Sequence, residues 1–456
     1  MASGRGHFAS RFGAVAAMAG SAIGLGNIWR FPYMVGQNGG AAFIFVYLLA
    51  AVFLCVPIFV SESVIGKRTQ LNTFGAMESL APGTGWKWMG ILTVVTPLII
   101  LSYYSVVGGW SIEYLIKSIT FSFADSGVAQ AEHSAAFGSF ISSAWKPVLF
   151  HTLFMAANVF VVAAGVHGGI ERFTKYTTPL LFVLIVAIMT YSLTLPGAGA
   201  GVEYMLKPDF SRLTSSSVLS AMGQAFFSLS LGVGSILTYS SYLKKEENLL
   251  ATSSCTVVFD LLFAMLAGFA VMPAVFAAGI EPGAGPGLIF ETLPFIFSSM
   301  AAESPVLSSV AAILFFVTIL FAALTSSISM LEVGVAYLVD EKKVPRVRAA
   351  VLLGLACWIL GVLCSLSFGP LGGVHLFGKS IFDFCDSLTS NFLMTFGSLL
   401  FVIFVGWKLD KAVVKDEFTG GGVHKANGSV FGVLYFFIKY VAPVAILVIF
   451  ISNLVL

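Results

Sequence analysis

The feature that most constrains this chain is a series of about eleven apolar segments, most of them twenty residues long or longer, that recur from one end to the other. A helix needs roughly 20 apolar residues to cross the hydrocarbon core of a bilayer, which is about 30 Å thick. Lipid cannot hydrogen-bond a peptide group, so such a segment satisfies its own backbone as a helix. We therefore expect an all-α polytopic membrane protein with segments at 12–37, 41–65, 86–119, 147–166, 176–195, 218–242, 249–278, 305–339, 349–368, 381–407 and 430–456.

Composition excludes several classes of function. Hydrophobic residues make up 58% of the 456 and charged residues only 10%, so lipid or other helices must surround most side chains. A net charge of +2 without a long basic run gives no footprint for nucleic acid, and no obligate protein partner is evident. The five cysteines include no CxxC pair, which argues against a disulfide framework or a zinc site.

One stretch matches a nucleotide-binding loop but lies in the wrong context. Residues 373–380 read Gly-Val-His-Leu-Phe-Gly-Lys-Ser, the P-loop pattern. A P-loop follows a strand and opens a helix in an α/β domain, whereas these residues join two apolar segments. The chain also has no HExxH or GxSxG motif. We therefore expect no enzyme activity and no organic cofactor.

The basic residues predict the orientation of the chain in the membrane. About 18 of the 24 Lys and Arg residues fall on the loops of one side. Positive residues near helix ends resist translocation, so this side is predicted to be the cytoplasm. The expected location is the bacterial cytoplasmic (inner) membrane, with the N-terminus in the cytoplasm and, after an odd number of helices, the C-terminus outside.

Two apolar segments contain glycines where a spanning helix should be regular. They read Gly20-Ser-Ala-Ile-Gly-Leu-Gly-Asn27 and Ser228-Leu-Ser-Leu-Gly-Val-Gly-Ser235. Interrupted helices at corresponding places in two halves indicate an inverted-repeat transporter with its site at the repeat interface, although glycines also permit close helix packing. We expect one transporter domain over 1–456, with helices 1 and 6 broken at mid-membrane, five-helix repeats at about 11–195 and 218–407, and an extra helix at about 430–456.

A broken helix provides groups that bind ions. Unwound carbonyl oxygens suit hard cations, and oxygen-bearing side chains would complete cation sites. The N-terminal end of a half-helix near Gly26 would face an anionic group. The side chains with suitable oxygens are those of Asn27, Ser228, Asp260, Thr325 and Ser326.

Ionisable residues inside apolar segments are costly and are functional by default. Asp260 lies mid-segment among apolar neighbours, where it either binds a cation or makes a structural hydrogen bond. Arg30 either takes part in function or extends to the membrane surface as arginines near helix ends often do. The full set is Arg30, Glu62, Asp260, Glu332, Asp383 and Asp386.

The flanks of the two breaks carry a recognisable set of motifs. They are Arg5, Arg11, Ala17-Met-Ala-Gly20, Gly24-Leu-Gly-Asn27, Trp29-Arg-Phe-Pro32, Asn38-Gly-Gly40, Gly223-Gln224, Ser228-Leu-Ser-Leu-Gly232 and Leu324-Thr-Ser-Ser327. Together they resemble the neurotransmitter:sodium symporter (SNF) family, in particular its bacterial sodium-coupled amino-acid transporters. The likeness runs from Arg5 to about Lys439. It implies secondary active symport by alternating access, with the substrate and two sodium ions held at the breaks.

The resemblance also implies which residues bind each ligand. The first sodium ion would be bound by the substrate carboxylate together with Ala22, Asn27, Ser228 and Asp260. The second would be bound by Gly20, Ile23, Ala322, Thr325 and Ser326. The substrate would contact Ser21, Ala22, Gly24, Gly26, Ile100, Tyr104, Phe227, Ser228, Ser230, Val233, Ser326 and Met330. Among these, Tyr104 would hydrogen-bond the substrate carboxylate and Phe227 would close the site.

The same resemblance implies two gates and a support. Arg30 would pair with Asp386 in the outer gate, with Asp383 as the alternative partner. Arg5 would pair with Asp340 in the inner gate. Glu62 would support the broken sixth helix.

Two positions bear on specificity. Gly24 stands where monoamine transporters of the family carry Asp, which favours amino acids, and the modest pocket side chains leave room for a branched-chain or aromatic neutral substrate. Asp260 stands where many relatives carry Asn and bind chloride nearby, so we expect chloride not to be required. A transporter of another small zwitterion or amine, or a channel or receptor, remains the alternative.

Overall fold

The computed structural model describes residues 6–280, 285–302, 304–424 and 427–455, and most of these residues are helical. Within these ranges the only β-type pairing is an isolated bridge between Leu376 and Lys379. This bears out the prediction of an all-α fold.

The membrane-spanning elements follow the apolar segments closely. In the described ranges nine helical spans are long and apolar enough to cross a bilayer, or ten if a pair bent by 51° near residue 23 counts as one. The sixth expected segment is divided between two shorter helices. The elements of these segments are α1 (Arg11–Ala22), α2 (Phe31–Gln37), α3 (Ala41–Ala50), α4 (Val56–Thr69), α6 (Lys87–Ile119), α8 (Lys146–Ala163), α9 (Arg172–Thr194), α11 (Ser215–Ser228), α12 (Ser235–Ser240), α13 (Leu249–Ala277), α15 (Pro305–Asp340), α16 (Arg346–Leu366), α17 (Ile381–Ser387), α18 (Met394–Ile403), α20 (Asn427–Phe436) and α21 (Ala442–Val455).

Within the described ranges, six π-helical turns interrupt or extend these spans, and the sequence analysis did not predict them. A π-turn widens the helix by one residue and often lies near a functional site. The turns are η1 (Gly26–Arg30), η2 (Ala51–Cys55), η3 (Val166–Glu171), η6 (Leu388–Leu393), η7 (Phe404–Lys408) and η8 (Phe437–Val441).

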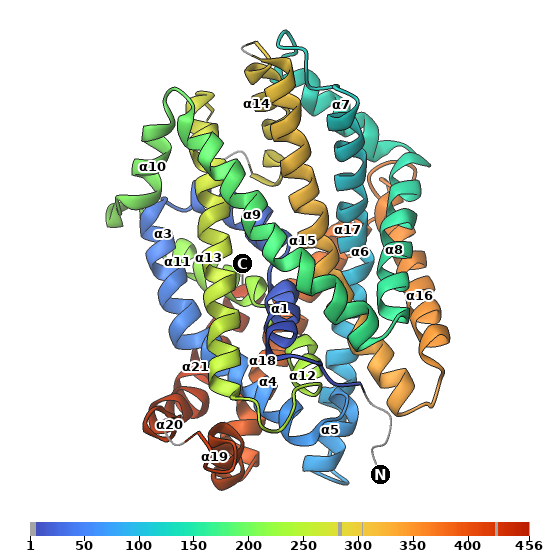
Figure 1. The fold of residues 1–456 in the computed structure, drawn as a ribbon, viewed down its shortest axis with the longest axis vertical. Coiled ribbons are helices and arrows are strands. Elements are labelled where there is room, and N and C mark those ends of the chain that lie inside the picture. Colours follow the sequence, from blue (N-terminus) through green and yellow to red (C-terminus); the bar gives the residue numbers. More distant parts are fainter. Residues whose placement is uncertain (1–5, 281–284, 303, 425–426, 456) are drawn as a thin grey trace.

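Short helices gather at the two ends of the bundle (Figure 1). One end carries α7 (Gln130–Ser142), α10 (Ala198–Leu206) and α14 (Thr292–Met300), and the other carries α5 (Thr73–Leu80) and α19 (Lys411–Thr419). The long helices α6 and α15 pack against each other through the middle of the molecule. The breaks in the first and sixth segments lie beside them.

Outward faces of the spans are covered by large apolar side chains. On α3 and η2, the side chains of Phe45, Leu49, Val52 and Phe53 are between 41% and 51% exposed. A contiguous apolar surface of this kind requires an apolar solvent. The protein is accordingly an integral membrane protein whose outer surface is matched to lipid.

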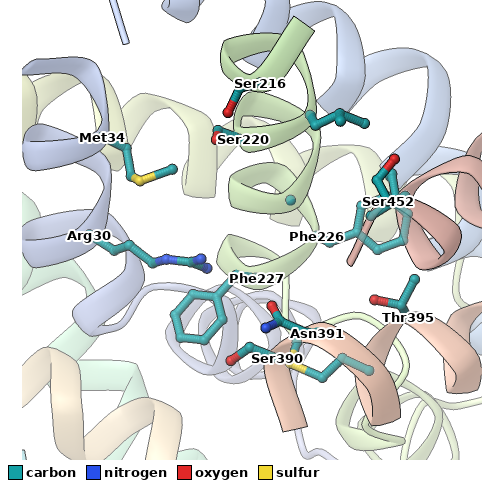
Figure 2. Close-up of a pocket in the computed structure, with 14 residues that line it drawn as sticks. Arg30, Met34, Ser216, Ser220, Phe226, Phe227, Ser390, Asn391, Thr395 and Ser452 are labelled. Atoms are coloured by element: carbon teal, nitrogen blue, oxygen red, sulfur yellow. The ribbon is translucent and has the colours of Figure 1, made fainter. Parts of the chain in front are cut away.

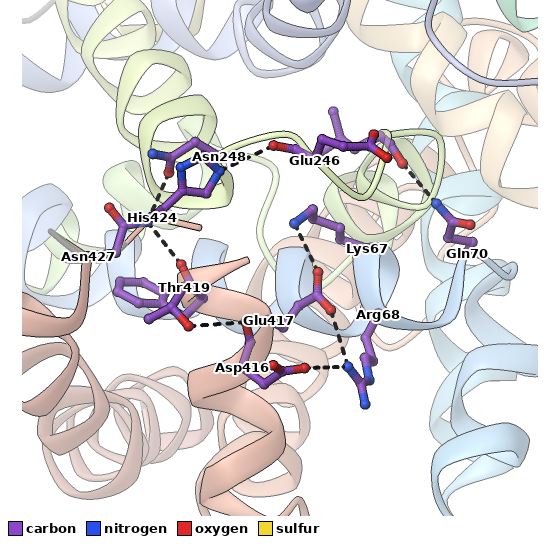
Figure 3. Close-up of polar contacts among 12 residues, drawn as sticks. Lys67, Arg68, Gln70, Glu246, Asn248, Asp416, Glu417, Thr419, His424 and Asn427 are labelled. Carbon is purple, nitrogen blue, oxygen red and sulfur yellow. Dashed lines mark hydrogen bonds and ion pairs between the residues drawn. The ribbon is translucent and has the colours of Figure 1, made fainter. Parts of the chain in front are cut away.

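A charged cluster joins α19 to the end of α4 (Figure 3). Lys67 is only 1% exposed, and its Nζ lies 3.0 Å from Glu417 Oε1. The neighbouring Arg68 lies 2.8 Å from Asp416 Oδ2 and 3.8 Å from Glu417 Oε2. We call Lys67, Arg68, Asp416 and Glu417 the α19 cluster. The segment 411–419, which lies between the expected segments 381–407 and 430–456, is thus a helix fixed to the bundle by ion pairs.

Candidate functional site

The first break separates α1 from the turn η1. Helix α1 ends at Ala22, and Ile23 adopts an extended conformation with φ −68° and ψ 108°. Gly24 follows, and a Cβ built on it would lie 2.8 Å from the Tyr104 hydroxyl and 3.0 Å from Ser326 Cβ. The close approach of these two side chains therefore requires glycine at position 24.

The second break extends over residues 229–234, between α11 and α12. Ser230, Gly232 and Gly234 all have positive φ, at 50°, 80° and 73°. The N–H of Gly232 donates to Glu62 Oε1 at 2.8 Å, and Glu62 is fully buried. A backbone donor freed by the unwinding thus finds a carboxylate partner. Glu62 lies where the resemblance assigns it, against the broken sixth helix.

A central cavity with an empty volume of about 360 Å³ lies between the two breaks. None of its lining side chains is charged. Eleven of the twelve residues expected to contact the substrate line it. Met394 of α18 lines it as well and was not predicted from the sequence. The lining residues are Ala22, Gly24, Gly26, Ile100, Tyr104, Phe227, Ser228, Ser230, Val233, Ser326, Met330 and Met394.

Ser21 is the expected substrate residue that the structure places elsewhere. Its hydroxyl donates to Ser329 Oγ at 2.7 Å, and it is absent from the lining of the central cavity. Residues 21 and 22 are neighbours on α1, so they point in different directions, and only Ala22 faces the cavity. A matched motif predicts where a residue lies along the chain, but it does not predict the direction in which the side chain points.

The residues implied for the first sodium ion form a buried polar cluster. The Asn27 amide donates to Asp260 Oδ1 at 2.8 Å and to Ser228 Oγ at 3.0 Å, and the Ser228 hydroxyl donates to Asp260 Oδ2 at 2.8 Å. Asp260 is fully buried. Carboxylate, amide and hydroxyl oxygens are the donors that a hard monovalent cation prefers, so the residues fit sodium chemically.

Two further residues extend this cluster beyond what the sequence predicted. The Tyr47 hydroxyl donates to Ser228 Oγ at 3.4 Å, and the Gln224 amide donates to the Gly26 carbonyl at 2.9 Å. Gln224 therefore links α11 to the turn after the first break. The Gly223-Gln224 motif could have indicated this role, whereas Tyr47 lies in an apolar run that gives no sign of it.

The residues implied for the second sodium ion gather where α15 meets the first break. The Thr325 hydroxyl lies 3.0 Å from the Ala322 carbonyl and 3.5 Å from the Ile23 carbonyl. A Cβ on Gly20 would lie 3.4 Å from Thr325 Cβ, so these elements touch. Carbonyl and hydroxyl oxygens from both elements thus come together, as a sodium site requires. Ser326 faces the central cavity beside them.

Above the central cavity lies a wider vestibule with an empty volume of about 1080 Å³. Arg30, Asp383 and Asp386 all line it. In the described part of the chain, no carboxylate lies within ion-pair distance of Arg30, whose guanidinium rests 4.6 Å from the centre of the Phe227 ring. The Asp386 carboxylate instead accepts from the Ser390 hydroxyl at 3.0 Å. The outer pair expected from the resemblance is therefore open in this structure.

A side cavity lies on the other side of Arg30 and Phe227, with an empty volume of about 800 Å³ (Figure 2). The Arg30 guanidinium lies beside Phe227, and both residues line the two spaces. Hydroxyl-bearing residues of α11, η6 and the last helix line other parts of the side cavity. The lining residues are Arg30, Met34, Ser216, Leu219, Ser220, Gly223, Phe226, Phe227, Ser390, Asn391, Met394, Thr395, Ile449 and Ser452.

Toward the C-terminal end of α15 lies a different group of charges. The Tyr242 hydroxyl donates to Glu332 Oε1 at 2.6 Å, and Arg346 forms a short ion pair with the same carboxylate. Glu332, an ionisable residue of the eighth expected segment, is fully buried, and these two partners satisfy its carboxylate. Asp340 accepts from the Asn72 amide at 3.4 Å. Its expected partner Arg5 lies outside the described residues.

Comparisons with known proteins point to one family along nearly the whole chain. The model of the sodium:neurotransmitter symporter family matches residues 5–138 and 137–456. An uncharacterised sodium-dependent transporter of Bacillus subtilis is 40% identical over 98% of this chain and 97% of its own length. An uncharacterised sodium-dependent transporter of Methanocaldococcus jannaschii is 34% identical over 88% of this chain and 81% of its own.

A solved structure is similar to this chain in both its sequence and its fold. The crystal structure of MhsT in complex with L-phenylalanine has a TM-score of 0.89 to this chain and 41% sequence identity. The match covers 99% of this chain and 100% of that one. The sodium-dependent serotonin transporter of Drosophila melanogaster is more distant, at 28% identity over 96% of this chain and 74% of its own length.

Proposed function

The chain belongs to the sodium:neurotransmitter symporter family and is a sodium-dependent transporter, not an enzyme, and from this premise we propose that it imports neutral L-amino acids with branched-chain or aromatic side chains. The observation that carries the proposal is the uncharged wall of the central cavity. With Gly24 in place of a carboxylate, nothing in that wall would pair with the amine of a substrate that lacks its own carboxylate.

Tyr104 supports a substrate that carries a carboxylate. Its oxygen accepts a hydrogen bond from the Leu25 N–H at 3.1 Å, so its own hydrogen is available to a second acceptor. Leu25 lies directly before η1, at the N-terminal end of a half-helix that continues into α2, and the partial positive charge of such an end favours an anion. A zwitterion would place its carboxylate here and its ammonium toward the free carbonyls of the breaks.

The apolar remainder of the cavity supports a hydrophobic side chain. Ile100, Val233 and Met330 line it, and each is at most 6% exposed. Burial of apolar surface contributes about 25 cal/mol per Å², so a branched or aromatic substrate gains more than a small one. The complex of the similar MhsT with L-phenylalanine supports the same class of substrate.

Two sodium ions accompany the substrate in this proposal. The cluster of Asn27, Ser228 and Asp260, with the Ala22 carbonyl, would hold the first against the substrate carboxylate. Thr325 and Ser326, with the carbonyls of Gly20, Ile23 and Ala322, would hold the second. Both sets join segments from the two proposed repeats, so occupancy would bind the repeats to each other.

Chloride is not required in this proposal, because Asp260 already supplies a fixed negative charge. The carboxylate is fully buried next to the first sodium set, where it would balance the charge of the ion. Replacement of chloride by gluconate is expected to leave uptake unchanged. A severalfold fall in uptake would contradict this part of the proposal.

Alternating access would follow from the arrangement of the gates. The outer gate would close when Arg30 leaves the ring of Phe227 and pairs with Asp386, or with Asp383, across the vestibule. The inner gate would open when Asp340 separates from Arg5. The N-terminus would lie in the cytoplasm of a bacterium, and the C-terminus outside, as the basic loops predict.

The deciding experiment is thermal stabilisation of the detergent-purified protein by each of the twenty amino acids, first in sodium and then in potassium. Branched-chain and aromatic amino acids should raise the unfolding temperature in sodium, because a ligand that binds only the folded state stabilises it. Stabilisation that is the same in potassium would contradict sodium coupling. Saturable, sodium-dependent counterflow in proteoliposomes would then exclude a channel.

A further inference from the structure

Two side chains, Phe227 and Met394, line both the central cavity and the side cavity. Phe227 also lines the vestibule, as expected of a residue that closes the site. Met394 lines only the two inner spaces, so it forms part of the wall that separates a cavity of about 360 Å³ from one of about 800 Å³.

Met394 reaches the central cavity because α18 contacts the second break backbone to backbone. A Cβ on Gly232 would lie 2.1 Å from the Met394 carbonyl oxygen, and a Cβ on Gly397 would lie 2.3 Å from the Gly232 carbonyl oxygen. Neither position has room for a side chain. The absence of both side chains brings α18 within reach of Ser230 and Val233, which line the same cavity.

Met394 combines a flexible side chain with a place beside the side cavity, whereas Met330, the other methionine of the central cavity, does not line the side cavity. Val233 and Ile100 are β-branched and have few rotamers, whereas methionine is unbranched and adapts to irregular spaces. Met394 is 4% exposed, so it is packed in the present arrangement. On its far side, however, the side cavity offers empty volume into which the thioether could move.

We propose that Met394 is the adjustable wall of the substrate pocket and determines the largest side chain that the pocket accepts. An aromatic substrate displaces the Met394 thioether into the side cavity, whereas a small aliphatic substrate leaves it in place. This inference rests on the proposed function, because it concerns the side chain of an amino acid bound in the central cavity.

The experiment compares valine, leucine, phenylalanine and tryptophan by thermal stabilisation in sodium, with purified wild type and variants. Met394→Ala should raise the affinity for tryptophan relative to valine by roughly tenfold, and Met394→Phe should lower it by at least as much. Ser220→Phe, which fills the side cavity without contact to the central one, should also disfavour the aromatic substrates. Met394→Leu keeps the volume with a stiffer side chain and should lose part of the aromatic preference.

Met34→Ala is the matched control, since this methionine lines the side cavity but not the central one, and its ratios should equal those of the wild type. Equal weakening of all four amino acids in the Met394 variants would overturn the inference while leaving the proposed function intact. Failure of every amino acid to stabilise the wild type would overturn the proposed function and this inference with it.

Discussion

The backbone at Gly24 passes between two side chains that both face the central cavity. A Cβ there would meet the Tyr104 hydroxyl at 2.8 Å and Ser326 at 3.0 to 3.1 Å, so even alanine must displace a residue of the proposed substrate site. Not every glycine near the breaks is constrained in this way. Gly223 in α11 has no atom within 4 Å of the position of a Cβ.

This contrast gives a first prediction. Gly24→Ala should weaken amino-acid binding by tenfold or more, which corresponds to a loss of about 1.4 kcal/mol. The control Gly223→Ala should bind normally, because the added methyl group meets open space. Titrations of thermal stabilisation in sodium measure both, and unchanged affinity in the Gly24 variant would contradict the assignment.

Asp260 gives the second prediction. Asp260→Asn keeps the side-chain shape but removes the fixed negative charge, so a mobile anion would be needed to balance the bound cation. Sodium-dependent substrate binding by the variant should therefore persist in chloride and be lost in gluconate. The wild type should bind equally in both salts. Identical binding by the variant in the two salts would show that Asp260 does not replace an anion.

Most residues around the central cavity could be predicted from sequence because they lie in motifs that adjoin a break. Met394 and Tyr47 could not, since each lies in an apolar run and reaches the site only through the packing of another helix. The direction of the Ser21 side chain could not be predicted from the sequence either, because it depends on how α1 is rotated against α15.

At the scale of elements, α19 was missed for a physical reason. The segment 411–419 is polar and short, and a helix of nine residues is marginal in water without tertiary contacts. Its ion pairs are with Lys67 and Arg68, which lie more than three hundred positions earlier in the chain.

The membrane spans themselves were predictable, because lipid leaves a long apolar segment no alternative to a helix. The π-turns within them replace a few i→i+4 hydrogen bonds by i→i+5 bonds and leave no trace in composition.

The α19 cluster gives the third prediction. Glu417→Gln should lower the free energy of unfolding by on the order of 3 kcal/mol, because it leaves the buried Lys67 ammonium without its counter-charge. Asp416→Asn is the matched control. The Arg68–Asp416 pair is 39% and 50% exposed, so its loss should change stability by less than about 1 kcal/mol. The midpoints of thermal unfolding at a fixed scan rate compare the two, and equal effects would contradict a distinct role for Glu417.

At the scale of the whole molecule, the coupling follows from charge and concentration. One charge that crosses 100 mV releases about 2.3 kcal/mol, and a tenfold sodium gradient adds about 1.4 kcal/mol. Two sodium ions would therefore supply roughly 7 kcal/mol per zwitterion imported. That is sufficient for about five decades of accumulation.

This stoichiometry gives the fourth prediction. In proteoliposomes held at zero membrane potential, a tenfold larger sodium gradient should raise the steady-state ratio of internal to external amino acid roughly a hundredfold. Coupling to a single sodium ion would give only about tenfold. Radiolabelled substrate at several sodium gradients measures the slope, with equal sodium on both sides as the control.

The contact between Gly232 and Gly397 also affects how mutational scans of this protein would be interpreted. Neither residue offers a side chain to a ligand, yet each would be damaged by almost any substitution, since a Cβ would lie within 2.3 Å of a carbonyl oxygen. In a growth-based screen these two positions would score as strongly as residues that hold the substrate. Such a screen would rank them correctly for fitness but would not separate a binding site from the backbone contact that supports it.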